Sequence, residues 1–408
     1  MKMRKATGSN PLFFEYISFC ITRKGRKTNH RIIPSDALQE SMEDVFIARA
    51  GAQSADRSTE KKIQALCSAA GLDMMVSAGD LTAVKVHFGE RGNDAFVPAM
   101  SVACVVEEVK KAGAKPFLTD TNTLYLGGRK NSADHLETAA QHGFCYPVVS
   151  CPVIIADGLK GQNYKEVEVY GKHFDTVKIA SDIVAADSLV VVSHFKGHEV
   201  AGFGGAIKNL GMGCAANEGK REQHTTRPFV LEDKCVTCGA CMNACAEFCI
   251  GLEGKSIVID YDHCVGCLMC MNVCPEHAID LDWQDDGVVF VEKMADYAAG
   301  AVANKTGKAF YINFLTNITP HCDCTPWNDI PFVPDIGILA SRDPVALDKA
   351  CYDLVNNAEG VHGSLLPDHH EAGEEKFTRV WPGTSPELQL EAAEEMNVGR
   401  REYRLIEV

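Results

Sequence analysis

The sequence contains no apolar run long enough to cross a membrane. A spanning helix needs about 18 or more consecutive apolar residues. The most apolar early stretch, PLFFEYISFCI, is shorter, includes Glu15 and has basic residues on both sides. It also lacks the small-residue cleavage site that ends a secretory signal peptide. We therefore expect a cytoplasmic protein with no membrane partner.

Positive charge is scarce outside the N-terminus. The chain has 408 residues and a net charge of −15. Residues 1–41 hold eight Lys and Arg against three Asp and Glu, so the remainder has 32 basic and 52 acidic residues, a net of −20. Such a surface repels phosphate backbones, which excludes nucleic acid as a partner of the body. We interpret residues 1–41 as a disordered basic extension and Met42 as the natural start of the fold.

The sequence also lacks a P-loop and a well-placed dinucleotide fingerprint. A glycine-rich run at 202–213 leads into a predicted helix that contains Lys208. Backbone N–H groups at such a helix can hold an anion. We favour the alternative, in which the glycines allow close backbone packing.

Strand and helix patterns alternate through residues 42–228 and again from 284 to 408. Repeated β-α units predict an α/β fold, with a mostly parallel sheet covered by helices. The segment YKEVEVYGKHFDTVKIA predicts a hairpin, and the tail after Gly360 predicts one late helix near 386–396. The predicted strands are VFIARA, TAVKVHF, KPFLTD, PVIIAD, SLVVVSHF, KAFYINFLTN and DIGILAS.

Cysteine, in contrast, is abundant, with 18 residues. In the absence of a secretory signal, clustered cysteines indicate metal ligands or catalytic thiols rather than disulfides. CVTCGACMNAC at 235–245 and CVGCLMCMNVC at 264–274 share the spacing C-x2-C-x2-C-x3-C, with an offset of 29 residues throughout. This internal repeat predicts a small α+β module at residues 229–283, inserted into the α/β body.

The spacing is typical of two [4Fe-4S] clusters. In such runs three cysteines bind one cubane and the fourth binds the other cluster, whereas zinc sites rarely have this spacing. The module resembles bacterial two-cluster ferredoxins over about 50 residues, although Ala246 stands where that family usually has Pro. We expect Cys249, which lies outside the spacing, to fill a small buried space. The expected ligands are Cys235, Cys238, Cys241 and Cys274 for cluster 1, and Cys264, Cys267, Cys270 and Cys245 for cluster 2.

Several polar side chains follow predicted strands of the body, where α/β sheets place their ligands. Cys322 and Cys324 lie in a predicted loop between two strands. In an extended backbone residues two apart point to one side, so the two thiols would share a side and Asp323 would face away. A disulfide between them would strain such a chain. The strand-end residues are Lys85, His87, Asp120, His194, Lys196 and His198.

Three interpretations of Cys322 and Cys324 stay open at this point. They bind a soft metal ion together with imidazoles, or they are structural thiols, or they are a redox-active or nucleophilic pair. The candidate catalytic residues are Lys196, His198, Cys322 and Cys324. The candidate site for an additional metal ion consists of His87, His194, His198, Cys322 and Cys324.

The combination of motifs resembles a known family. KVHFGE, SHFKGHEVAGFGGAIKNLGMG, the inserted module, PHCDC and DIGILASRDPVALDKA are similar to the uncharacterised iron–sulfur centre proteins of domain-of-unknown-function family 362. The resemblance runs from about Met42 to Gly360. It implies an α/β body with an inserted ferredoxin, in anaerobic or facultatively anaerobic bacteria and archaea. It implies no substrate, because the family has no settled activity.

Three functions are compatible with these observations. The first is iron–sulfur electron transfer to or from a redox partner protein, or a small-molecule ligand bound in the body. The second is a reductase, an oxidoreductase whose catalytic site in the body is fed by the clusters. The third is a metal-handling or maturation factor in which the CDC stretch carries metal. We expect the first, because it rests on the cysteine spacing alone, whereas the others require residues 87, 194–198 and 322–324 to meet.

Overall fold

The computed structural model describes residues 42–408, except 126, 225–227, 265–268 and 282. The predicted basic extension and the predicted ligand Cys267 therefore lie outside the described residues. Residues Met42–Val408 form one compact unit. Within the described part of the chain, no helix is long and apolar enough to span a membrane.

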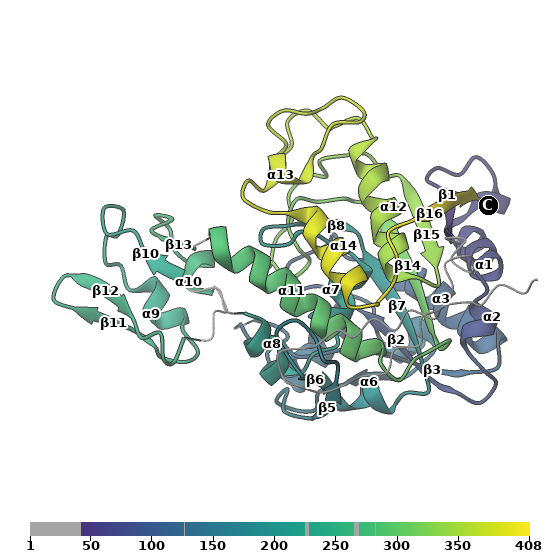
Figure 1. The fold of residues 1–408 in the computed structure, drawn as a ribbon, viewed down its shortest axis with the longest axis horizontal. Coiled ribbons are helices and arrows are strands. Elements are labelled where there is room, and N and C mark those ends of the chain that lie inside the picture. The colour runs from purple at the N-terminus through teal and green to yellow at the C-terminus, as the bar shows by residue number, and fades with distance from the viewer. Residues whose placement is uncertain (1–41, 126, 225–227, 265–268, 282) are drawn as a thin grey trace, which may run out of the picture. The chain divides into compact units, whose positions relative to one another are not determined.

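An eight-stranded sheet lies at the centre of the body (Figure 1). Its strand order is β16-β1-β15-β14-β7-β2-β3-β4. Among these strands β15 alone runs antiparallel to its neighbours, so the mostly parallel sheet is confirmed. The strands are β1 (Glu43–Arg49), β2 (Leu81–Val86), β3 (Lys115–Asp120), β4 (Val153–Ile155), β7 (Ser188–His194), β14 (Ala309–Leu315), β15 (Gly337–Ser341) and β16 (Tyr403–Glu407).

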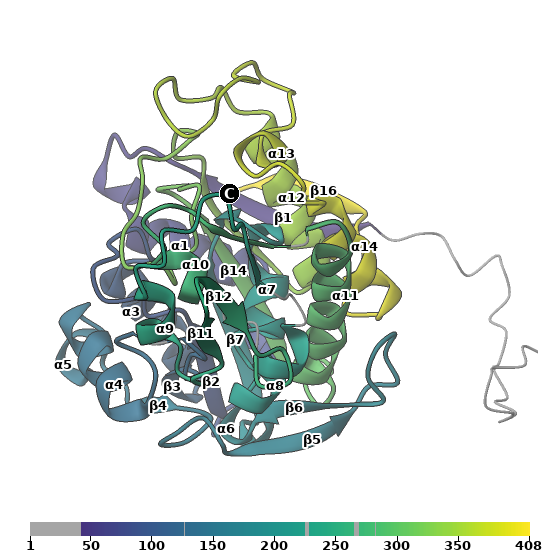
Figure 2. The same cartoon turned by 90° about the vertical axis from the view of Figure 1, so that its left-hand side faces the viewer.

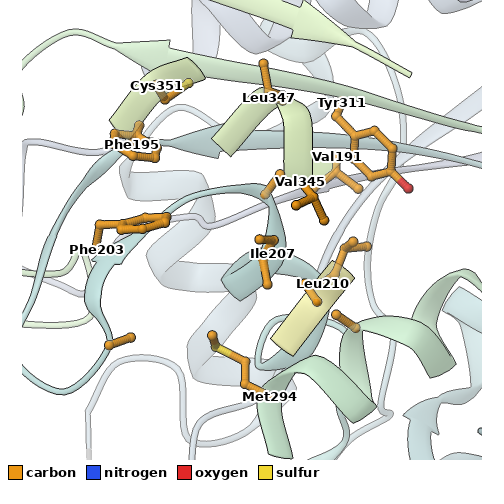
Figure 3. Packing of buried hydrophobic residues seen from close by; sticks show 14 of the residues in the cluster. Val191, Phe195, Phe203, Ile207, Leu210, Met294, Tyr311, Val345, Leu347 and Cys351 are labelled. Carbon is orange, nitrogen blue, oxygen red and sulfur yellow. The ribbon is translucent and has the colours of Figure 1, made fainter. Parts of the chain in front are cut away.

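Helices cover both faces of the sheet (Figure 2). Successive side chains of a strand point to opposite faces, so β7 supplies Val191 to one core and Val190 to the other. In the first core Ile207 and Leu210 lie among apolar side chains of the sheet and of neighbouring helices (Figure 3). That core contains α7 (Ala206–Gly211), α11 (Trp283–Val302), α12 (Pro344–Asn356) and α14 (Pro386–Glu395), and the second contains α1 (Thr59–Ala69), α3 (Ala99–Lys111) and α4 (Ser132–Gln141).

The shorter elements connect these layers. The predicted hairpin is present as β5 (Tyr164–Glu168) paired antiparallel with β6 (Thr176–Ala180). A second small hairpin joins β8 (Lys196–His198) to β9 (Gly202–Gly204). The other elements of the body are η2 (Ala55–Arg57), α2 (Leu72–Met75), α5 (Tyr146–Val149), α6 (Ser181–Ala185), α8 (Asn217–Gln223) and α13 (Phe377–Val380).

The C-terminal tail has one strand that the sequence did not predict. The expected late helix is α14, but β16 follows it and pairs parallel with β1. β16 lies at the sheet edge, where Arg404 forms an ion pair with Asp44. Because an edge strand is half exposed, β16 lacks the continuous apolar run that marks a buried strand.

The segment 228–281, called the cysteine-rich insert below, has its own elements. β10 pairs antiparallel with β13, and β11 pairs antiparallel with β12. The sequence repeat therefore appears as two strand–helix–strand units, β10-α9-β11 and β12-α10-β13. The elements are β10 (Pro228–Val230), α9 (Ala240–Ala244), β11 (Ile250–Glu253), β12 (Ser256–Ile259), α10 (Met269–Asn272) and β13 (Ile279–Leu281).

Candidate functional site

The strand order reverses between β2 and β7. From β2 the chain continues to β3 and β4 on one side, and from β7 it continues to β14 on the other. In open α/β sheets ligands bind outside the carboxyl ends of the strands at such a switch point. His87 directly follows β2, and His194 is the last residue of β7. The sheet therefore brings these two histidines, which belong to different sequence motifs, to the switch point.

The loop between β14 and β15 reaches the same edge. The carbonyl of Cys322 accepts a hydrogen bond from the amide of Thr325 at 3.1 Å, so the backbone turns here and the expected extended conformation is wrong. The two thiols interact nevertheless, because each shifts the pKa of the other. The strain expected in a disulfide was derived for an extended chain and stays a prediction for this turn.

Asp323 connects this loop to β7 through a hydrogen bond with His194. Its Oδ1 lies 2.7 Å from Nδ1 of His194, and both side chains are buried. Nε2 of His194 faces the carbonyls of Thr316 and Asn317, each at 3.0 Å. Burial would raise the pKa of Asp323, but the charges of His194 and Lys196 outweigh it and hold the pKa well below its usual range. His194 therefore positions the loop and has both nitrogens engaged.

Lys208 of α7 contacts the thiol pair. Its Nζ lies 3.8 Å from Sγ of Cys322. Hydrogen bonding with Cys324 lowers the pKa of Cys322, whereas burial raises it. The charges of Lys208 and Lys196 lower the pKa further, so it lies well below its usual range. The same hydrogen bond and burial raise the pKa of Cys324 well above its usual range. The pair thus favours a thiolate at Cys322 and a thiol at Cys324.

His87 and His198 are both oriented through Nδ1. The amide of Gly89 donates to Nδ1 of His87 at 3.0 Å, and the amides of Val200 and Ala201 donate to Nδ1 of His198 at 3.2 and 3.0 Å. A nitrogen that accepts carries no proton, so a neutral ring has its proton on Nε2. Burial lowers the pKa of both rings well below the usual range. Each ring therefore offers a ligand an N–H donor.

These orientations bear on the predicted additional metal ion. A metal-binding histidine usually donates its second ring nitrogen to an acceptor, whereas His87 and His198 accept at that position and His194 has no nitrogen to spare. Within the ranges that the structure describes, no group of three or more His, Cys, Asp or Glu side chains is placed to hold a metal ion. The geometry does not favour a metal ion at this point.

A buried ionic network lies beside the thiol pair. Lys85 Nζ lies 2.9 Å from Asp120 Oδ1 and 2.7 Å from Asn209 Oδ1. Arg129 contacts Asp120 at 3.4 Å and Glu90 at 3.2 Å. The sequence pointed to Lys85 and Asp120 as strand-end residues. It did not single out Glu90, which ends the KVHFGE motif, or Arg129, which lies in a loop outside any motif. Buried charges of this kind are retained only when paired.

The cysteine-rich insert contains a cavity lined by Cys235, Cys238, Cys241 and Cys274. Apolar side chains such as Ile257 complete its wall. These four are the residues that the spacing assigned to cluster 1. A cubane takes each cysteine on a different iron, so its ligands surround a space, whereas zinc requires four sulfurs at about 2.3 Å from one point. Among the described residues no group of three or more His, Cys, Asp or Glu side chains is placed to surround a single metal ion, so the four cysteines suit a cubane rather than one zinc ion, and the cluster stays a prediction.

The residues expected at cluster 2 are described only in part. Cys245, Cys264 and Cys270 belong to one apolar cluster of the insert, and Cys267 lies outside the described residues. Cys249 is buried, as expected, and its Sγ lies 3.3 Å from Sγ of Cys245. Burial and hydrogen bonds with Cys245 and Cys264 raise its pKa. It therefore lies against two expected ligands, which the spacing alone did not indicate.

Comparisons with known proteins identify the family. Residues 82–353 match the family described as Domain of unknown function (DUF362), and no curated protein matches the chain. Among solved structures, the lactate racemase apoprotein from Thermoanaerobacterium thermosaccharolyticum is similar, with a TM-score of 0.34 and 12% identity. That similarity covers 71% of this chain and 54% of the racemase chain, so this protein spans about half the length of that relative. The protein belongs to the DUF362 family.

Proposed function

We propose that this protein is a cytoplasmic iron–sulfur electron-transfer protein that holds two [4Fe-4S] clusters in its cysteine-rich insert. The observation that carries the proposal is the cavity bordered by Cys235, Cys238 and Cys241 from the first repeat and Cys274 from the second. Sharing ligands between repeats is typical of two-cluster modules. Each cluster would supply one-electron chemistry, and burial, hydrogen bonds and solvent access around the cysteines would set its potential.

The connection of the insert to the body supports a relay between them. The ring of His224, at the end of α8, stacks on Phe290 of α11 with centroids 5.1 Å apart, so the two segments that flank the insert touch. Burial and the charges of Lys208 and Lys220 lower the pKa of His224 to about 3. β10 begins at Pro228, four residues after His224, and so starts within about 14 Å of it. The insert thus joins the body close to the lysine that contacts Cys322.

A reductase is the second candidate. The observation in its favour is the set of donors at the switch point, where Nε2–H of His87 and His198 accompany Lys196 and Lys208. Such donors bind carbonyl, carboxylate or other acceptor groups of a small molecule. In this alternative the body binds the substrate and the clusters deliver electrons from a redox partner protein.

Metal analysis of the anaerobically purified chain tests the proposal. We expect about eight irons and eight sulfides per chain, since each cubane contains four of each. Cys238→Ser removes a ligand of cluster 1 and should lower the iron content to about four. The control, Cys104→Ser, alters a half-buried thiol on α3 outside the insert and should keep the full content. Zinc in place of iron, or about four irons in the unmodified chain, would overturn the proposal.

A further inference from the structure

The thiol pair at the switch point lies outside the cysteine-rich insert and is not needed for the clusters. Cys322 is 1% exposed, whereas Cys324 keeps part of its surface accessible. They belong to one turn, closed by the hydrogen bond from the amide of Thr325 to the carbonyl of Cys322. The two thiols shift each other's pKa in opposite directions. The turn therefore holds the two thiols as interacting neighbours.

A comparison with Cys351 shows why these are not ordinary core thiols. Cys351 on α12 is fully buried, contacts the Asn313 amide at 3.4 Å, and its pKa is raised well above the usual range by burial. Cys322 is as deeply buried but has the ammonium of Lys208 at 3.8 Å. Reactive cysteines have such cationic neighbours, and inert ones do not.

The glycine-rich run makes room for the cations around the pair. A Cβ on Gly204 would lie 3.1 Å from Nζ of Lys196 and 3.2 Å from Cδ of Lys208. A Cβ on Gly205 would lie 2.4 Å from Oδ1 of Asp348, whose carboxylate accepts hydrogen bonds from the first amides of α7. The glycine-rich run thus allows close packing of the backbone, as we expected from the sequence. This packing places Lys208 next to Cys322.

We propose that Cys322 and Cys324 form a two-electron dithiol–disulfide centre that exchanges electrons with the clusters of the insert. The exchange rests on the proposed function of the insert, while the dithiol chemistry rests on the turn that carries both cysteines and on the contact between Lys208 and Cys322. The low pKa of Cys322 agrees with it, because the thiolate is the form that reacts.

The step balances within one chain. Oxidation forms the bond between the two Sγ atoms and breaks the S–H bond of Cys324. Starting from the Cys322 thiolate, it releases two electrons and one proton. The two oxidised [4Fe-4S] clusters that the insert would hold could each take up one of these electrons. The proton leaves to solvent, which reaches the half-buried Cys324. Reduction of the disulfide follows the same path in reverse.

The helix that holds Lys208 also contacts the segment that leaves the insert. The position of a Cβ on Gly211, the last residue of α7, is 2.5 Å from Cγ and from the carbonyl oxygen of Met294. Met294 belongs to α11, which begins directly after β13. α7 therefore lies between the thiol pair, which Lys208 contacts, and the middle of α11, the helix that follows the insert.

Mass spectrometry of the anaerobic holoprotein tests the proposal. The protein is oxidised with ferricyanide, alkylated with iodoacetamide and digested; a second sample is first reduced with dithionite. After oxidation we expect the peptide with Cys322 and Cys324 to be unalkylated and about two mass units lighter, for two hydrogens lost. After reduction we expect two alkyl groups on it. Cys351→Ser, in the core, serves as the control and should behave like the unmodified protein.

Iron content, measured on the same samples, separates failure of this proposal from failure of the proposed function. Two alkyl groups on the peptide after oxidation, with iron still near eight per chain, would overturn the proposed dithiol centre. That result would not contradict the proposed [4Fe-4S] clusters. Cys322→Ser and Cys324→Ser should keep the iron content of the unmodified protein. A loss of iron in either variant would also overturn the proposal, because the thiols would then be cluster ligands.

Discussion

The Lys208 ammonium lies 3.8 Å from the Cys322 sulfur, although 114 residues separate them in the chain. The contact joins α7 to the loop between β14 and β15. It therefore unites the glycine-rich motif and the CDC motif, which are separate features in the sequence, at the carboxyl edge of the sheet. The contact also reinforces the low pKa of Cys322.

Replacing Lys208 with Met should make Cys322 less reactive. The ammonium stabilises the thiolate, so its loss raises the pKa of Cys322. Where the pKa exceeds the assay pH, each further unit of increase lowers the thiolate fraction about tenfold, so the pH at which the modification rate rises should move upward. The rate of iodoacetamide modification at Cys322, followed by mass spectrometry between pH 5 and 9, measures this. Lys111→Met, at an exposed lysine of α3, is the matched control. An unchanged rate and pH profile in Lys208→Met would show that Lys208 does not stabilise the thiolate.

Replacing Asp323 with Asn should destabilise the fold. Asp323 and His194 are buried and 2.7 Å apart, and breaking a buried pair by removing one partner costs about 3–5 kcal/mol. The exposed pair of Arg379 and Asp368 provides the control, because losing such a pair costs less than about 1 kcal/mol. Thermal unfolding under anaerobic conditions compares Asp323→Asn with Asp368→Asn. Equal midpoints for the two variants would contradict the role given to Asp323.

The same pair predicts a pH dependence. The folded-state pKa of Asp323 is depressed, so the stabilisation from its ionised form is complete above the ordinary value of about 3.9 and is lost as pH falls toward the lower folded value. The difference in unfolding midpoint between the unmodified protein and Asp323→Asn should thus be constant from about pH 5 to 8 and shrink below about pH 4. A difference that grows on acidification would refute this assignment.

Replacing Gly205 with Ala should disturb the thiol pair from a distance. The new Cβ would lie 2.4 Å from Oδ1 of Asp348, which must move and release the first amides of α7. α7 carries Lys208, so we expect a lower unfolding midpoint and slower modification of Cys322. Gly287→Ala in α11 is the control, because its Cβ would meet nothing closer than 3.9 Å and alanine favours helix. Normal Cys322 reactivity in Gly205→Ala would contradict this route.

The sequence predicted the parts of the fold whose signals are local. The apolar runs of β2, β7 and β14 were found where expected, because buried strands have local signatures. β16 was missed because it is an edge strand, which forms by pairing with a neighbouring strand and does not require a continuous apolar run. Its neighbour, β1, lies at the other end of the described chain.

The candidate site was predictable as a set of residues but not as a mechanism. Parallel strands gather their carboxyl ends at one edge, which is why His87 and His194 could be expected near each other. The proton positions on His87 and His198 depend on amides two or three residues away, and the charge on Cys322 depends on Lys208. Such details follow from loop geometry, which residue types do not reveal.

A reductive titration of the fully oxidised holoprotein tests the central claim most directly. With two one-electron clusters and one two-electron disulfide, the unmodified chain should take up about four electrons. The double variant Cys322→Ser and Cys324→Ser should take up about two, at an unchanged iron content. Uptake of about two electrons by the unmodified chain would contradict the dithiol centre, and uptake of none by the double variant would contradict the clusters themselves.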